Sequence, residues 1–155
     1  MQVSSSIKKA LHQRCLTLAE DRIVSLQHIL KEAQQAANNE TKSSAGDKHE
    51  TGRAMAQLET EKLTAQLSEA LNIKQNLTQI NPTITNNTVV LGSMVYTNKG
   101  NFYIAASIGK VAIENEVFFA ISPASPIGKL LLTKKEKEKE SFSLNDNEYT
   151  ILAVI

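Results

Sequence analysis

A polar stretch at residues 38–53, NNETKSSAGDKHETGR, divides two long segments in which apolar residues recur at helical spacing. The stretch contains no large apolar residue, and Ser43, Ser44 and Gly46 favour a turn. A polar turn between two amphipathic helices brings them back beside each other as an antiparallel hairpin. We therefore predict an antiparallel coiled-coil finger over residues 1–81, with its tip at residues 38–53.

The first segment carries one apolar stripe with no Gly or Pro to interrupt it, which predicts a single long helix. Ser4, Ser5 and Ser6 offer N-cap oxygens, so we expect this helix to begin near Ile7. A helix of about 30 residues would be roughly 45 Å long. The stripe consists of Ile7, Leu11, Cys15, Leu18, Ile23, Leu26, Leu30, Ala33 and Ala37.

The second segment shows a seven-residue repeat that is typical of a coiled-coil seam. Asn81-Pro82 should end this helix, because the residue before a proline avoids the helical region. The repeat consists of Ala56, Leu63, Ala70 and Leu77, with Leu67 and Leu71 between them.

From residue 82 the pattern changes to short β-branched and aromatic runs separated by turns, which predicts a second, globular domain over residues 82–155. Ser125-Pro126 opens a short helix as a cap followed by proline at the first helical position. The fold class is therefore α+β, with the two-helix hairpin followed by a small antiparallel β-sheet of four to six strands and one short helix. The expected strands lie at residues 88–91, 93–97, 101–106, 117–121 (the best candidate for a central buried strand) and 149–154, the last closing a hairpin with Phe142 and Leu144 through a turn at 145–147.

The composition of the chain excludes several classes of function and location. The net charge of +1 gives no overall basic field for non-specific nucleic-acid binding. Cys15 is the only cysteine, which excludes an internal disulfide and predicts a small core residue. The N-terminus has no secretory pattern, and no stretch approaches the roughly 20 apolar residues of a membrane span. We expect a cytoplasmic protein that does not associate with membranes.

Outside the turn, the sequence contains few polar side chains in a pattern typical of a catalytic or binding site. No Ser/His/Asp or Cys/His constellation, phosphate-binding Gly loop or metal-spaced Cys set is present, so an enzyme with its own active site and small-molecule substrate is not expected. His12 and His28 are interpreted as surface residues of the first helix. The basic residues of that helix are interpreted as a solvated face, with contact to RNA or an acidic channel as the alternative: Lys8, Lys9, Arg14 and Arg22.

Two motifs together resemble the Gre family of bacterial transcript cleavage factors, in order and spacing over nearly the whole chain. GDKHE at residues 46–50 is similar to the Gly-Asp-x-x-Glu motif at the tip of the Gre finger. ISPASPIGKLL at residues 121–131 is similar to the Ser-Pro-Ile/Leu-x-x-x-Leu segment of the Gre C-terminal domain. That domain has a fold related to one class of prolyl isomerases.

The resemblance implies a transcription elongation factor that has no autonomous active site. The base would bind RNA polymerase at its secondary channel, and the finger would bring Asp47 and Glu50 to the catalytic centre of the polymerase. There the two carboxylates would share a second Mg²⁺, present only in the complex, and promote cleavage of backtracked nascent RNA. Ser125, Pro126 and Ile127 lie in the matched segment of the base and are the candidate partner-binding residues.

Alternatives remain open for the same residues. Asp47 as N-cap with Glu50 three residues later would make a box-like cap, which needs no metal. The family motif continues with a further acid and an aromatic residue, whereas this chain continues Thr51-Gly52-Arg53. The resulting tip is formally neutral, which favours a non-cleaving channel regulator of the same architecture. A peptide-binding module and a transition-metal site at His49 are the remaining, weaker alternatives.

Overall fold

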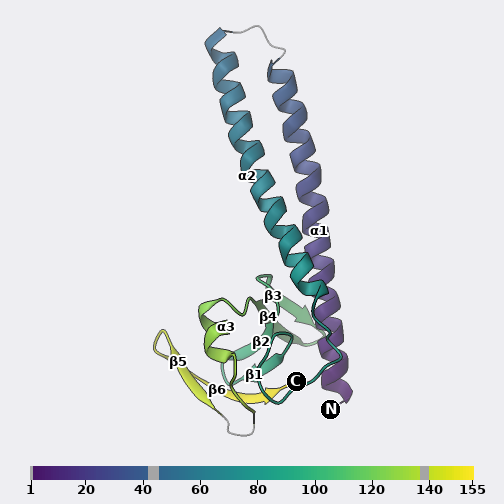
Figure 1. The fold of residues 1–155 in the computed structure, drawn as a ribbon, viewed down its shortest axis with the longest axis vertical. Helices are drawn as coiled ribbons and strands as arrows, with labels where there is room; N and C mark the ends of the chain where they lie inside the picture. The colour runs from purple at the N-terminus through teal and green to yellow at the C-terminus, as the bar shows by residue number, and fades with distance from the viewer. Residues whose placement is uncertain (1, 42–45, 137–139) are drawn as a thin grey trace. The chain divides into compact units, whose positions relative to one another are not determined.

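The computed structural model describes residues 2–41, 46–136 and 140–155, without the side chains of residues 2, 3, 40, 41 and 46–49. Two long helices precede a six-stranded sheet with one short helix (Figure 1). Helix α1 spans Gln2–Thr41, α2 spans Gly46–Thr78 and α3 spans Pro126–Leu131. The predicted α+β class, with a pair of N-terminal helices, is confirmed.

The chain divides into two compact units. Ala19–Asn72 forms a helical unit, and Met1–Leu18 together with Ile73–Ile155 forms a unit that contains the sheet. Each long helix contributes residues to both units. The predicted division of the chain into domains at residue 81 stays a prediction.

Both long helices differ at their ends from the sequence prediction. Helix α1 begins at Gln2, so Ser4, Ser5 and Ser6 lie inside it and do not cap it. Serine in a helix interior costs only a few tenths of a kcal/mol relative to alanine, and the helix continues through the three serines. Helix α2 ends at Thr78, and the Oδ1 atom of Asn81 then accepts a hydrogen bond from Thr83 N at 3.0 Å in the turn before the sheet.

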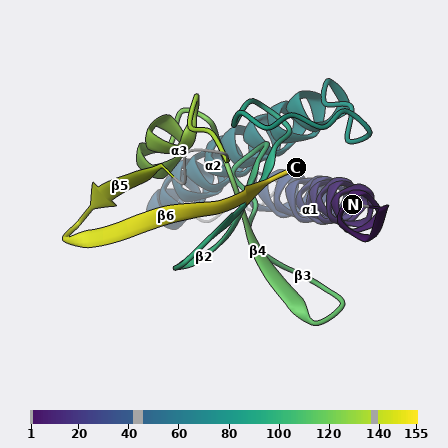
Figure 2. The same cartoon turned by 90° about the horizontal axis from the view of Figure 1, so that it is seen from below.

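The sheet has the strand order β3-β4-β2-β1-β6-β5 and is mixed, whereas an antiparallel sheet was predicted. Strands β2 and β4 pair in parallel, and all other neighbours are antiparallel. Strand β3 forms the edge of the sheet and is antiparallel to β4, which lies between β3 and β2. Strand β4 therefore runs in the same direction as β2 (Figure 2). The strands are β1 (Met94–Thr97), β2 (Gly100–Ile104), β3 (Gly109–Ile113), β4 (Glu116–Ile121), β5 (Ser141–Leu144) and β6 (Asn147–Val154).

Strand β4 is not the central buried strand that its apolar sequence predicted. It is second from the edge, and its burial alternates: Phe118 and Ala120 are buried, whereas Val117 is 38% and Phe119 is 40% exposed. Only one face of β4 is therefore fully covered. Its edge partner β3 was not predicted as a strand. The closing β5–β6 hairpin was predicted, and positive φ values at Asn145 (51°) and Asp146 (66°) form its turn.

A helix of the same unit packs against each face of the sheet. Phe102 and Ile104 of β2 pack in one core with Leu131 of α3. Tyr103 alternates with them, so it points to the other face, where it meets His12 of α1. The first core also contains Val89, Val95, Phe142, Ile151 and Val154, with Ile121, Ile127, Leu130, Leu132 and Tyr149 packed against it.

Candidate functional site

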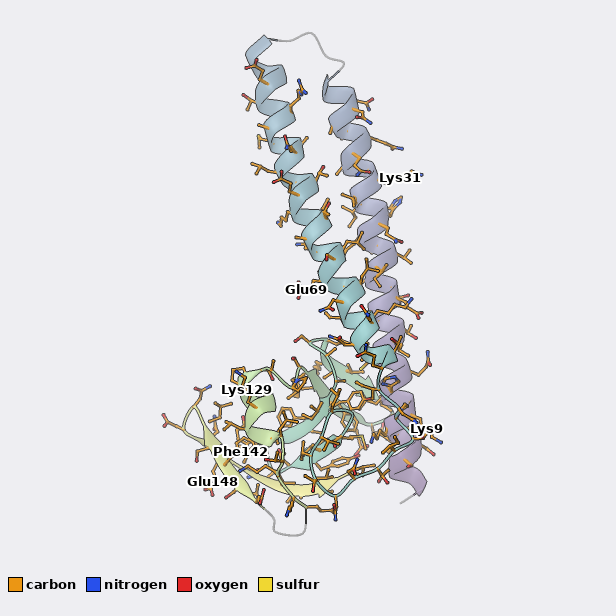
Figure 3. The ribbon with its side chains drawn as sticks, in the orientation of Figure 1. Lys9, Lys31, Glu69, Lys129, Phe142 and Glu148 are labelled. Atoms are coloured by element: carbon orange, nitrogen blue, oxygen red, sulfur yellow. The ribbon has the colours of Figure 1, made fainter. Side chains whose placement is uncertain are left out.

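The helical unit, Ala19–Asn72, is held together by the predicted apolar seam. Ile23 and Leu26 of α1 pack with Leu63 and Ala70 of α2, and all four are at most 7% exposed. The helices run side by side along this unit, and Lys31 and Glu69 point away from the pair (Figure 3). The seven-residue repeat of α2 thus identified the buried face of the hairpin, but Leu71, which was predicted to lie beside the repeat, is 47% exposed.

The two predicted tip carboxylates lie in the first turns of α2. The helix begins at Gly46, so Asp47 and Glu50 are both helical residues three positions apart. Glu50 is exposed, and the side chain of Asp47 lies outside the described residues. The helix begins one residue before Asp47, and because the side chain of Asp47 lies outside the described residues, the alternative in which it caps the helix stays a prediction. Helix residues three positions apart are neighbours on the helix surface, as a shared cation would require.

A groove follows the carboxylates along the hairpin, with a volume of about 280 Å³. Arg53 carries the only formal charge among the described residues that line it. The other lining groups are mainly carboxamides and a hydroxyl, which donate hydrogen bonds as well as accept them. The lining residues are Gln34, Ala37 and Asn38 from α1, and Arg53, Gln57 and Thr60 from α2. The cationic residue that departs from the family motif therefore lines this groove.

The second predicted site, at the start of α3, is a well-formed helix cap. Ser125 Oγ accepts a hydrogen bond from Gly128 N at 3.1 Å and donates one to Ser122 O at 2.7 Å. Pro126 occupies the start of the helix and is exposed, whereas Ile127 is half-buried against the core. Of the three candidate partner-binding residues, Pro126 is the one whose side chain is mainly in solvent.

Gly128 is required by the same cap. A Cβ atom at this position would lie 2.3 Å from Ser122 O and 2.8 Å from Ser125 Oγ. Both atoms are fixed by the cap hydrogen bonds, so neither can move away without breaking the cap. The segment's sequence, Ser-Pro-x-Gly, is therefore explained by local structure, whatever it binds.

Two polar residues of α1 that were predicted to be at the surface are buried instead. Lys8 is 2% exposed, and its Nζ donates to Ile84 O at 2.7 Å and to Ile155 O at 3.1 Å. His12 is 6% exposed, and its Nδ1 lies 2.7 Å from the hydroxyl oxygen of Tyr103. Lys8 lies three residues before Leu11, and His12 lies three residues before Cys15, so all four residues share one face of the helix. That shared face was the signal that could have identified them.

Burial shifts the pKa values of the buried side chains on this face of α1. It lowers the pKa of Lys8, and it lowers the pKa of His12 with a further contribution from the charge on Lys8. It raises the pKa of Cys15 to about 12, so this thiol is a protonated core residue, as predicted. His28 and the basic residues Lys9, Arg14 and Arg22 are exposed, as expected.

Comparison with known proteins gives similarity of structure only. No protein-family model matches the chain, and no curated protein matches it. The solved structure of the transcription factor Gfh1 is similar over 91% of this chain and 93% of its own, with 19% identity and a TM-score of 0.39. A structure of GreA factor homolog 1 (Gfh1) from Thermus thermophilus is similar over 92% of this chain and 95% of its own, with 18% identity and a TM-score of 0.38.

The described part of the chain offers neither a metal-binding cluster nor a membrane-spanning helix. Within that part of the chain, no group of three or more His, Cys, Asp or Glu side chains could hold a metal ion. The predicted pair Asp47 and Glu50 falls partly outside it, as does His49, so both metal sites stay predictions. Neither long helix, where described, carries the length of apolar sequence that crosses a membrane.

Proposed function

We propose that this chain is an accessory factor of RNA polymerase whose helical hairpin enters the secondary channel. The observation that supports it is the helical placement of Asp47 and Glu50 at the turn of a packed two-helix unit. A carboxylate pair on one helix is useful for catalysis only if a second molecule completes the site. The capped Ser125-Pro126 segment of the sheet unit is the proposed contact with the polymerase surface.

The two carboxylates fit a shared Mg²⁺ but not one held by this chain alone. Mg²⁺ prefers octahedral oxygen ligands and is commonly held by one or two carboxylates together with phosphate and water. Asp47 and Glu50 would supply two such oxygens, and the polymerase and the RNA would supply the rest. When bound, the metal would stabilise the attacking and leaving oxygens of RNA hydrolysis. The proposed role of Asp47 and Glu50 is to hold it in place.

The test is RNA cleavage in a stalled, backtracked elongation complex with the cognate polymerase. The wild-type chain should shorten the transcript from its 3′ end, and Asp47→Ala with Glu50→Ala should abolish this while leaving polymerase binding intact. The matched control is Glu59→Ala with Glu61→Ala, which removes two carboxylates from the same helix outside its first turns. Equal loss of cleavage in the control, or no binding by the wild type, would contradict the proposal.

A non-cleaving channel regulator is the second candidate, and the position of Arg53 favours it. Arg53 lines the groove three residues after Glu50, and its positive charge would oppose the accumulation of positive metal charge at the tip. In the same assay, a regulator would bind polymerase and change pausing or initiation without shortening the transcript. Arg53→Ala would then raise cleavage from a low level, whereas in a working cleavage factor its effect would be small.

A further inference from the structure

Four aromatic side chains form a continuous row across the sheet face that carries α3. The ring centres of Phe119 and Phe102 are 6.1 Å apart, and those of Phe102 and Tyr149 are 6.3 Å apart. Tyr149 then stacks on Phe142 at 5.1 Å with an angle of 7° between the rings. The row crosses the sheet from β4 and β2, over β1, which contributes no ring to it, to β6 and β5. We refer to these four residues as the aromatic row.

Two members of the row are accessible to a ligand. Phe119 is 40% exposed and Tyr149 is half-buried, whereas their cross-strand partners Phe102 and Phe142 are buried in the core. Gly100 lies beside this end of the row, where an added Cβ would make ordinary contacts of 3.9 Å with Phe102 and 4.0 Å with Phe119. The row therefore presents aromatic surface to solvent next to a position without a side chain.

Two lysines lie beside the Phe119 end of the row. Lys110 of β3 is the register partner of Phe119, so its exposed side chain lies on the same face, directly beside the ring. Lys99 is exposed in the turn before Gly100. Glu116 and Glu148 each lie one residue away from a residue of this face, so they point to the opposite face. Glu140 lies two residues before Phe142 and opposite Ile151, so it places one carboxylate on this face at the far end of the row. An anion is therefore favoured at the Phe119 end of the row.

We propose that the aromatic row, together with Lys99 and Lys110, binds single-stranded nucleic acid. Flat bases stack on exposed aromatic rings, and their phosphates seek lysines, so one ligand satisfies both features of the surface. An acidic peptide would satisfy the lysines but not the rings, and a purely apolar peptide would leave the lysines unused. The site lies outside the hairpin turn and the α3 cap, so it goes beyond the proposed function.

The first experiment measures anisotropy of labelled oligouridylate and oligothymidylate, each of about twelve nucleotides, with the full chain and no polymerase. Phe119→Leu keeps an apolar side chain but removes the stacking surface, and it should weaken binding roughly tenfold. Phe119→Trp should bind at least as tightly as the wild type. Leu152→Ala is the matched control, an exposed apolar residue of β6 outside the row, and should leave binding unchanged. Comparing the two oligonucleotides shows whether RNA or DNA is preferred.

A second variant tests the charge separately and does not depend on core packing. Lys110→Gln should reduce the slope of log K against log salt by about 0.7, the effect of one phosphate contact on a single strand. Lys9→Gln, which removes an exposed lysine of α1 (Figure 3), should leave that slope unchanged.

Three results would overturn the proposal. An abasic strand of the same length and charge could bind as tightly as the oligouridylate, which would show that stacking plays no part. A folded Phe119→Leu variant could bind as the wild type does. An acidic peptide could displace the oligonucleotide at lower concentration than unlabelled oligouridylate does. Because polymerase is absent throughout, none of these results bears on the proposed channel function.

Discussion

The Nδ1 atom of His12 lies 2.7 Å from the hydroxyl oxygen of Tyr103, and the two side chains are 6% and 0% exposed. Their rings meet edge to face at 88°. This hydrogen bond joins the first turns of α1 to β2 inside the sheet unit. Neither group has access to bulk water as a substitute partner, so each depends on the other.

Replacing Tyr103 by phenylalanine should therefore lower the free energy of unfolding by about 1–3 kcal/mol, because His12 would keep a buried polar nitrogen without its partner. Urea unfolding followed by circular dichroism measures the change. Tyr149→Phe is the control, since Tyr149 is half-buried and the change should stay within about 0.5 kcal/mol. Equal losses in the two variants would show that the hydrogen bond is not the cause.

The same pair predicts a dependence of stability on pH. Burial, and then the charge on Lys8, lower the pKa of His12 from its ordinary value of 6.5, so the unfolded chain binds this proton more readily than the folded chain. The contribution of neutral His12 is thus fully present above pH 6.5 and is lost as the pH falls toward the lowered folded-state pKa. The loss is at most about 1.4 kcal/mol per pH unit.

The measurement compares the free energy of unfolding at mildly acidic and neutral pH in wild type and His12→Gln. The variant should lose the part of the pH dependence that belongs to this histidine. His28→Gln should retain it, because His28 is exposed and paired with Glu32 at 3.2 Å on the helix surface. If the curves of His12→Gln and wild type stay parallel, another group causes the acid sensitivity.

The features that could be predicted from the sequence depend on neighbours in the chain. The seam through Leu63 and Ala70 follows from a repeat within one helix, and the α3 cap follows from Ser125 and Pro126 side by side. The buried roles of Lys8 and His12 depend on Ile84, Tyr103 and Ile155, which are 76 to 147 residues away. Lysine and histidine are residue types that usually lie at the surface, and only the tertiary contacts show that these two are buried.

The sheet and the candidate site show the same limit. Strand β4 was located correctly, but its parallel pairing with β2 depends on where β3 lies, and the sequence of β4 does not contain that information. In the candidate site, Asp47 and Glu50 are three residues apart, and they lie on one helix because α2 begins at Gly46. Whether Asp47 acts as a cap or in catalysis depends on a helix start that sequence patterns locate only to within a few residues.

The cap of α3 predicts that Gly128→Ala is strongly destabilising. The new Cβ would lie 2.3 Å from Ser122 O, so the turn at residues 122–125 would have to move and lose its hydrogen bonds. We expect a loss of about 2–4 kcal/mol, which combines overpacking with a broken cap. Thermal unfolding measures it, with the adjacent exposed Lys129→Ala as the control. A wild-type melting temperature for Gly128→Ala would show that the turn relaxes freely.

Under the proposed function, substitutions at Ser125 should mainly change stability, and a substitution at Pro126 should mainly change partner binding. Ser125→Ala removes the acceptor for Gly128 N and should cost about 1 kcal/mol, whereas Ser125→Thr keeps a hydroxyl and should restore most of it. Pro126→Ala should change stability little, because its side chain is exposed. The same change should weaken binding to RNA polymerase, since Pro126 is the member of the segment that is open to a partner.

Equilibrium unfolding and a polymerase-binding assay on the same three variants give the two readouts. If Ser125→Ala and Pro126→Ala lose affinity only in proportion to stability, the segment is a helix start and not a docking surface. If Pro126→Ala loses affinity at unchanged stability and Ser125→Thr retains both, the exposed proline contacts the partner and the serine holds it in position. The two residues would then have different functions one position apart, as their hydrogen bonds and exposure indicate.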